Sequence, residues 1–63
     1  MLKIYYGKKV NITDHNGYVF TGVVNDYFFA DDNESGVDSI VLETTNGDLF
    51  EFTTNDIAEI SVI

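Results

Sequence analysis

The residues best suited to chemistry in this chain form a short acidic run from Asp31 to Gly36. The run begins like the Ca²⁺-binding loop pattern D-x-N-x-S-G, in which oxygen ligands alternate along the chain and a glycine allows a sharp turn. The twelfth position of such a loop needs a bidentate Glu, and Leu42 stands there instead. We therefore interpret the run as a solvated acidic loop, with weak Ca²⁺ binding as the alternative.

The single histidine, His15, is the one candidate for proton transfer. It stands beside Asn16-Gly17, a turn signal, and no residue at a characteristic spacing completes a set of nucleophile, base and orienting group. The chain contains no cysteine, so no disulfide can form, and a zinc site is not expected. We predict a protein that is not an enzyme and holds no cofactor or metal.

Charge is distributed unevenly along the chain. The basic residues Lys3, Lys8 and Lys9 precede all eleven acidic residues, which run from Asp14 to Glu59 and give a formal net charge of -8. Nucleic-acid binders gain affinity when Lys and Arg displace counterions from phosphates, and this chain has no arginine. The acidic residues are expected to keep the protein soluble or, alternatively, to bind a partner protein with a basic surface.

Length and hydropathy indicate a small cytoplasmic domain. No apolar run approaches the roughly 20 residues of a membrane span, and absent cysteine is compatible with a reducing compartment. A 63-residue domain buries only roughly 60% of the surface that its unfolded chain exposes. Without disulfides or metal, oligomerisation is the remaining support, so we expect a protein that associates with itself and not with membranes.

Two Asn-Gly pairs, at positions 16–17 and 46–47, each interrupt a β-patterned run. Asn-Gly favours a type I′ hairpin turn, which needs positive φ at both central residues. Alternation of apolar and polar residues predicts five strands, at 8–15, at 18–29, from 40 onward, at 49–52 and at 57–63. The sequence therefore predicts an all-β fold with one domain over residues 1–63.

The second predicted strand is apolar on both faces and has Gly22 near its middle. This pattern predicts a strand that bends and contributes to two sheets, with Gly22 allowing a close approach. Thr53 and Asp56 fit a capping arrangement, and the short stretch that follows favours a single 3₁₀ turn. These features favour a small five-stranded SH3-like barrel over an OB-like barrel, whose usual helix does not fit in 63 residues.

Part of the sequence resembles the Sm-like (LSm) superfamily. The first Sm motif is matched in spacing by a glycine before the first strand, a turn glycine and a set of apolar positions, namely Gly7, Val10, Gly17, Phe20, Gly22 and Val24. The second motif is matched in outline by Phe52, Ile57 and Ile60. The resemblance implies a barrel that forms rings, in which the fourth strand of one subunit pairs with the fifth strand of the next.

The sequence departs from the family at the nucleotide pocket. In RNA-binding Sm proteins this pocket is formed by an Asp and an Asn after the second strand and by an Arg of the second motif. The corresponding positions here are Phe28, Asp32 and Thr53, and none keeps the family residue. The resemblance therefore supports the barrel and the ring, but it does not support uridine-binding chemistry.

Nine aromatic residues are more than so small a chain can place around one core. Phe20, Phe50 and Phe52 are assigned to the core as bulky filling. Consecutive residues of a strand point to opposite faces, so at least one of Tyr27, Phe28 and Phe29 should contact a partner or a second subunit. The apolar last strand would aggregate if left free, and the expected interface between subunits comprises Phe50, Phe52, Ile57, Ile60 and Val62.

Two functional hypotheses follow from these observations. The first is a non-enzymatic Sm-like interaction module that forms a homo-oligomer with an acidic surface. The alternative is an RNA-binding Sm-like protein whose nucleotide site has been rebuilt from basic and aromatic residues near the start of the chain, namely Lys3, Lys8, Lys9, Tyr5 and Tyr6.

Because Leu42 replaces the bidentate ligand, millimolar Ca²⁺ should change the melting temperature no more than Na⁺ at matched ionic strength does. Thermal melts followed by circular dichroism in the two salts test this expectation. A stabilisation specific to Ca²⁺ would restore the metal-binding interpretation of the acidic run.

Overall fold

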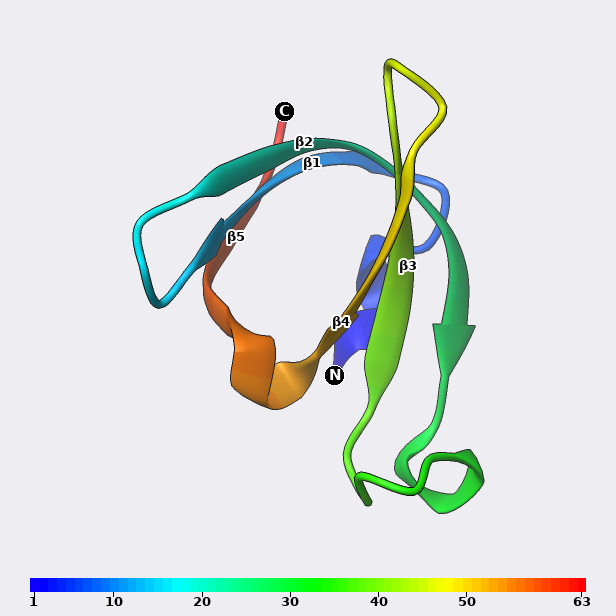
Figure 1. Ribbon diagram of the computed structural model, residues 1–63. Helices are drawn as coiled ribbons and strands as arrows, with labels where there is room; N and C mark the ends of the chain where they lie inside the picture. The colour runs from blue at the N-terminus through cyan, green and yellow to red at the C-terminus, as the bar shows by residue number, and fades with distance from the viewer.

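Five antiparallel strands form one sheet in a computed structural model that describes residues 1–63 (Figure 1). The strand order is β4-β3-β2-β1-β5, and there is no α-helix. In chain order the elements are the 3₁₀ turn η1 (Leu2–Tyr5), β1 (Lys9–Asp14), β2 (Val19–Phe28), η2 (Ala30–Asp32), β3 (Ser39–Thr44), β4 (Leu49–Thr53), η3 (Thr54–Asp56) and β5 (Ile57–Val62). The all-β prediction is confirmed. The sheet is not closed, because β4 and β5 are its two edges.

Both Asn-Gly pairs form hairpin turns, but the predicted type I′ geometry is wrong. No residue other than glycine has positive φ, whereas Gly17 and Gly47 have φ of 87° and 84°. In the first hairpin the Gly17 N–H donates to the Asp14 carbonyl over 3.1 Å, and the Asp14 N–H donates to the Tyr18 carbonyl. These contacts define a three-residue loop in which only the glycine is left-handed, so asparagine avoids the steric cost of that conformation.

A side chain at the start of each hairpin loop supports this geometry. Asp14 Oδ1 accepts hydrogen bonds from the backbone N–H groups of Asn16 and Tyr18, each over 2.9 Å. At the equivalent position of the second hairpin, Thr44 Oγ1 accepts from the Asp48 N–H over 3.2 Å. Short polar side chains that bond to the nearby backbone are a common stabiliser of such turns.

The long strand β2 arches from its pairing with β1 to its pairing with β3 (Figure 1). Gly22 lies opposite Val10 on one side and opposite Thr44 on the other, and it is buried. A Cβ atom at Gly22 would lie 2.8 Å from the carbonyl carbon of Glu43 and closer still to its oxygen. The predicted close approach is therefore confirmed. The pairing with β3 also shifts register between Val24 and Asp26, which adds to the bend.

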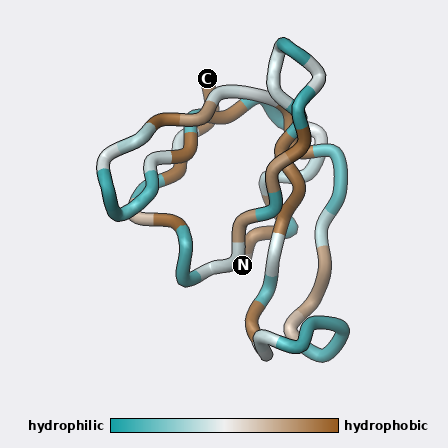
Figure 2. Tube along the Cα trace, in the orientation of Figure 1, coloured by the Kyte–Doolittle hydropathy of each residue, from teal (hydrophilic) through white to brown (hydrophobic).

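The hydrophobic core lies on the concave side of the bent sheet. Figure 2 shows that hydrophobic residues follow the strands and that the loops at the strand ends are hydrophilic. The core comprises seven buried residues from η1 and the first four strands: Leu2, Val10, Ile12, Val24, Ile40, Leu42 and Phe52. None of them belongs to β5, which contributes only half-buried Ile57 and Ile60 to the packing. The interior is therefore small and is covered least well along β5.

The turn between β4 and β5 has the predicted capping arrangement. The Thr53 N–H donates to Asp56 Oδ2 over 2.9 Å, and the Thr53 side chain accepts from the backbone N–H of Asp56. The capping box closes a 3₁₀ turn of three residues, as the sequence predicts. It fixes the direction in which β5 leaves β4.

Replacing Gly22 should destabilise the protein even when only a methyl group is added. In Gly22→Ala the new Cβ meets the Glu43 backbone, which cannot rotate away as a side chain would, so we expect a loss of about 3 kcal/mol in the free energy of unfolding. Denaturant titration measures this loss. The control is Val23→Ile, which adds a methyl group at an exposed neighbour and should change stability by less than about 0.5 kcal/mol. Equal effects of the two variants would refute the close approach.

Candidate interaction surfaces

The two edge strands leave a row of unpaired backbone groups on each side of the sheet. They approach each other only through η3, where the chain passes from β4 to β5 (Figure 1). Leu49 on β4 and Val62 on β5 are 63% and 55% exposed, and Glu59 is the single charged residue of β5. Two unpaired edges with exposed apolar side chains and little charge are suited to pairing with another strand.

The predicted interface residues fall into three groups. Val62 is exposed on β5, and Ile57 and Ile60 are half-buried against the core. Phe50 remains 39% exposed on β4, whereas Phe52 is only 6% exposed and belongs to the core. The Phe52 side chain is therefore unavailable for contact, and only its backbone could take part in pairing.

Phe20 connects the two phenylalanines of β4. Its ring centroid lies 5.2 Å from that of Phe50 and 5.1 Å from that of Phe52, with the rings tilted or edge-on. The rings thus form a chain from buried Phe52 through half-buried Phe20 to exposed Phe50. The expectation that all three rings fill the core holds for Phe52, while Phe20 is half-buried and Phe50 is exposed.

A second aromatic cluster forms where η1 meets the end of β2. The Tyr27 ring lies edge-on to Tyr6 at 5.3 Å and to Phe29 at 5.4 Å between centroids. Lys3 Nζ lies over Tyr27 and Phe29, 5.6 and 5.7 Å from the ring centroids. Tyr27 is half-buried against the core, whereas Phe28 and Phe29 are exposed. Burial does not alternate through this segment, because Phe29 is exposed like Phe28 although its ring packs against Tyr27. Phe28 is the exposed residue of the three that takes no part in the cluster.

The residues of the alternative RNA site are divided between different surroundings. Lys3 and Tyr6 belong to the aromatic cluster at η1, and Tyr5 is half-buried against the core. Lys9 lines a separate recess with Thr21, Val23 and Glu43. Lys8 is exposed in the connection between η1 and β1. Lys3 therefore faces the rings of the aromatic cluster, whereas Lys9 faces a recess that Glu43 also lines.

The positions of the Sm-like nucleotide pocket lie at the ends of two connections that meet. The backbone N–H of Thr54 in η3 donates to the carbonyl of Asp38 over 2.9 Å, which joins the β2–β3 connection to η3. Phe28 and Asp32 are exposed, and Thr53 is held in the capping box. The two connections are thus adjacent, but the residues at these positions provide neither an amide nor a cation.

The acidic run is solvated, as the sequence predicts, because every residue of 31–36 except half-buried Asn33 is exposed. It overlaps η2, and Asn33 Nδ2 donates to the Val37 carbonyl and to Ser39 Oγ over 2.8 and 3.0 Å. Ser39, which is fully buried, donates in turn to Glu51 Oε2 over 2.8 Å. No group of three or more His, Cys, Asp or Glu side chains is arranged to hold a metal ion.

A recess of about 310 Å³ opens between the β1–β2 hairpin, β4 and η3, and the sequence patterns do not indicate it. His15 is exposed at its wall, where its Nε2 lies 2.9 Å from the Asn55 carbonyl oxygen, and Phe20, Phe50 and Asp56 also line it. The sequence gives no signal for this recess, because residues 14–16 and 50–56 are far apart along the chain and come together only when the chain folds. It brings polar side chains of the hairpin and η3 together with the rings of Phe20 and Phe50.

Comparison with known proteins gives no family assignment: no family model, curated protein or solved structure matches the chain. None of the helical segments has the length and apolar character needed to cross a bilayer.

Neighbouring positions of β2 should respond differently to truncation. Tyr27→Ala removes contacts with the core, Tyr6 and Phe29, and should cost about 2 kcal/mol of stability, because the ring is only half-buried. Phe28→Ala, on the opposite face, should cost less than about 1 kcal/mol. Urea titration of both variants measures the difference. Similar losses would mean that Phe28 also packs against the protomer.

Proposed function

We propose that this protein is a non-enzymatic interaction module that assembles with copies of itself by pairing β4 of one copy with β5 of the next. The observation that carries the proposal is the pair of free edges with exposed Leu49 and Val62. Each copy would then contact one neighbour through β4 and another neighbour through β5. Such a head-to-tail contact closes into a ring or extends as a filament. Pairing removes both edges at once, and a long apolar edge that stays free is a site of aggregation.

The assembly would also cover the least protected part of the core. Val62 lies opposite Val10 and Ile60 opposite Ile12, so both edge residues belong to the same face as buried core residues. Phe50 lies opposite Leu42 in the same way on the other edge. These side chains extend the core to the edges of the open sheet, and a neighbouring strand would bury them further.

The fold type that fits this mode of assembly is a small SH3-like barrel of the Sm-like kind. The bent β2, the close approach at Gly22 and the single 3₁₀ turn η3 before the last strand support it. The spacing of glycines and apolar residues from Gly7 to Val24, which matches the first Sm motif, supports the same fold type. The resemblance implies a ring in which β4 of one subunit pairs with β5 of the next.

The net charge of -8 supports a protein partner with a basic surface rather than RNA. Phosphates would be repelled by most of the surface, because three lysines stand against eleven acidic residues. A titration with oligo-U at increasing salt separates the two hypotheses, because tight binding with a steep salt dependence would favour RNA.

The assembly is tested by placing a lysine at an edge. Val62→Lys and Leu49→Lys put a charge on an exposed position of each edge strand, where a paired neighbour would have to bury it. Sedimentation velocity at micromolar concentration should show an oligomer for the unmodified protein and a monomer for both variants. The matched control is Val19→Lys, because Val19 is 60% exposed but lies on the central strand β2.

The control should remain an oligomer, and thermal melts should show that all three variants are folded. A stable monomer for the unmodified protein would refute the proposal. Dissociation by Val19→Lys, with oligomers retained in the edge variants, would place the interface on the outer face of the sheet instead.

A further inference from the structure

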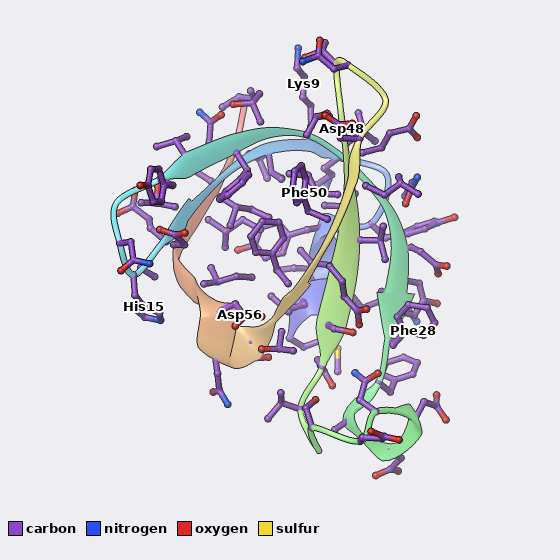
Figure 3. All side chains as sticks on the ribbon, viewed as in Figure 1. Lys9, His15, Phe28, Asp48, Phe50 and Asp56 are labelled. Atoms are coloured by element: carbon purple, nitrogen blue, oxygen red, sulfur yellow. The ribbon has the colours of Figure 1, made fainter.

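The recess between the β1–β2 hairpin, β4 and η3 has the size of a small binding site. Its volume of about 310 Å³ is at the lower end of the roughly 300–1,000 Å³ of small-ligand pockets. Figure 3 shows Phe50 pointing into the space beside β4, with His15 on the hairpin and Asp56 on η3 at its border. All of these residues belong to one protomer, and one of them, Phe50, also lies on the β4 edge proposed for pairing.

The wall of the recess is rich in hydrogen-bond acceptors. Asp14 and Asp56 each use one carboxylate oxygen to bind backbone N–H groups, Oδ1 in Asp14 and Oδ2 in Asp56. The second oxygen of each carboxylate has no donor within the protein. These interactions hold the two carboxylates in place without neutralising them, because backbone N–H groups carry no net charge. Neither Lys nor Arg lines the recess.

His15 also lines this wall. Its Nε2–H group donates to the Asn55 carbonyl oxygen over 2.9 Å, because a carbonyl can only accept. A ligand that matches this wall must supply several donors and a positive charge.

The floor of the recess is aromatic. Phe20, Phe50 and Phe52 all line it, and the Phe20 ring contacts the other two rings. Aromatic faces attract cations, and the chain provides its own example at its other aromatic cluster, where Lys3 lies over Tyr27 and Phe29. At the recess the rings are present and no cation of this chain accompanies them.

We propose that this recess binds an arginine side chain presented by a partner polypeptide. A guanidinium is planar and can stack on Phe50 while its N–H groups reach the carboxylates of Asp14 and Asp56. A lysine ammonium is strongly hydrated and has no flat face to stack, so it fits the aromatic floor less well. A second copy of this chain cannot be the occupant because it has no arginine. Nucleic acid is disfavoured because its phosphates would meet the three carboxylates of the recess, Asp14, Glu51 and Asp56.

The proposal is tested with a capped pentapeptide that carries one central arginine among glycine and alanine residues. Titration into the ¹⁵N-labelled protein, followed by amide chemical shifts, should perturb His15, Phe50, Asn55 and Asp56. A peptide with lysine in place of arginine should bind about tenfold more weakly, because it loses the planar group that stacks. A peptide with neutral citrulline should not bind measurably, because it loses the charge.

Charge variants show whether the two carboxylates act as proposed. Asp14→Asn and Asp56→Asn keep an acceptor oxygen for the backbone N–H groups but remove the charge, and each should weaken arginine-peptide binding about tenfold. The matched control is Asp31→Asn, an exposed carboxylate on η2 that changes the net charge equally and should leave binding nearly unchanged. Melting temperatures within a few degrees of the unmodified protein confirm that the turns are intact.

Three results would overturn the proposal. One is an equal loss of binding in Asp31→Asn, which would mean that net charge alone attracts the peptide. Another is equal binding of the citrulline peptide. The third is perturbation of the recess amides by oligo-U and not by the arginine peptide. Sedimentation of the same variants keeps the result separate from self-assembly, because a failure of assembly changes the sedimentation coefficient and not the arginine-specific shifts.

Discussion

The close approach of β2 and β3 at Gly22 is the constraint on which the rest of the structure depends. Because Gly22 has no Cβ, its backbone can meet the backbone of Glu43, and the sheet bends there instead of remaining flat. The bend brings Val10 and Ile12 of β1 into one core with Ile40 and Leu42 of β3. Without it, a single five-stranded sheet would have two open faces and no interior.

The same bend determines where the surfaces for interaction lie. It leaves β4 and β5 as the two edges of the sheet, connected by the short capped turn η3. The hairpin between β1 and β2 reaches the same end of the molecule, where His15 contacts Asn55. The free edges and the acceptor-rich recess thus both follow from the bend, and they share Phe50 of β4.

Local features could be predicted from the sequence, and features that join distant segments could not. The hairpin positions and the capping box of Thr53 and Asp56 depend on residues within one turn of each other, and both are confirmed. The turn type is wrong because Asn-Gly suits two geometries, and Asp14 and Thr44 favour the one in which only glycine is left-handed. The recess depends on residues 14–16 and 50–56, which no short pattern connects.

Charge and apolar surface are separated in this molecule in a way that suits two kinds of contact. The connection between β2 and β3 alone carries Asp31, Asp32, Glu34 and Asp38, whereas β5 carries only Glu59. Strand pairing between copies would bury backbone groups and apolar side chains. Repulsion between two acidic copies is weakest where the paired edges carry little charge. The carboxylates of Asp14 and Asp56 lie at turns instead, where their backbone hydrogen bonds fix them beside aromatic rings. A strongly acidic chain would therefore pair with itself, as we propose, along edges that carry one carboxylate each, and would still present fixed negative charge to a cationic partner.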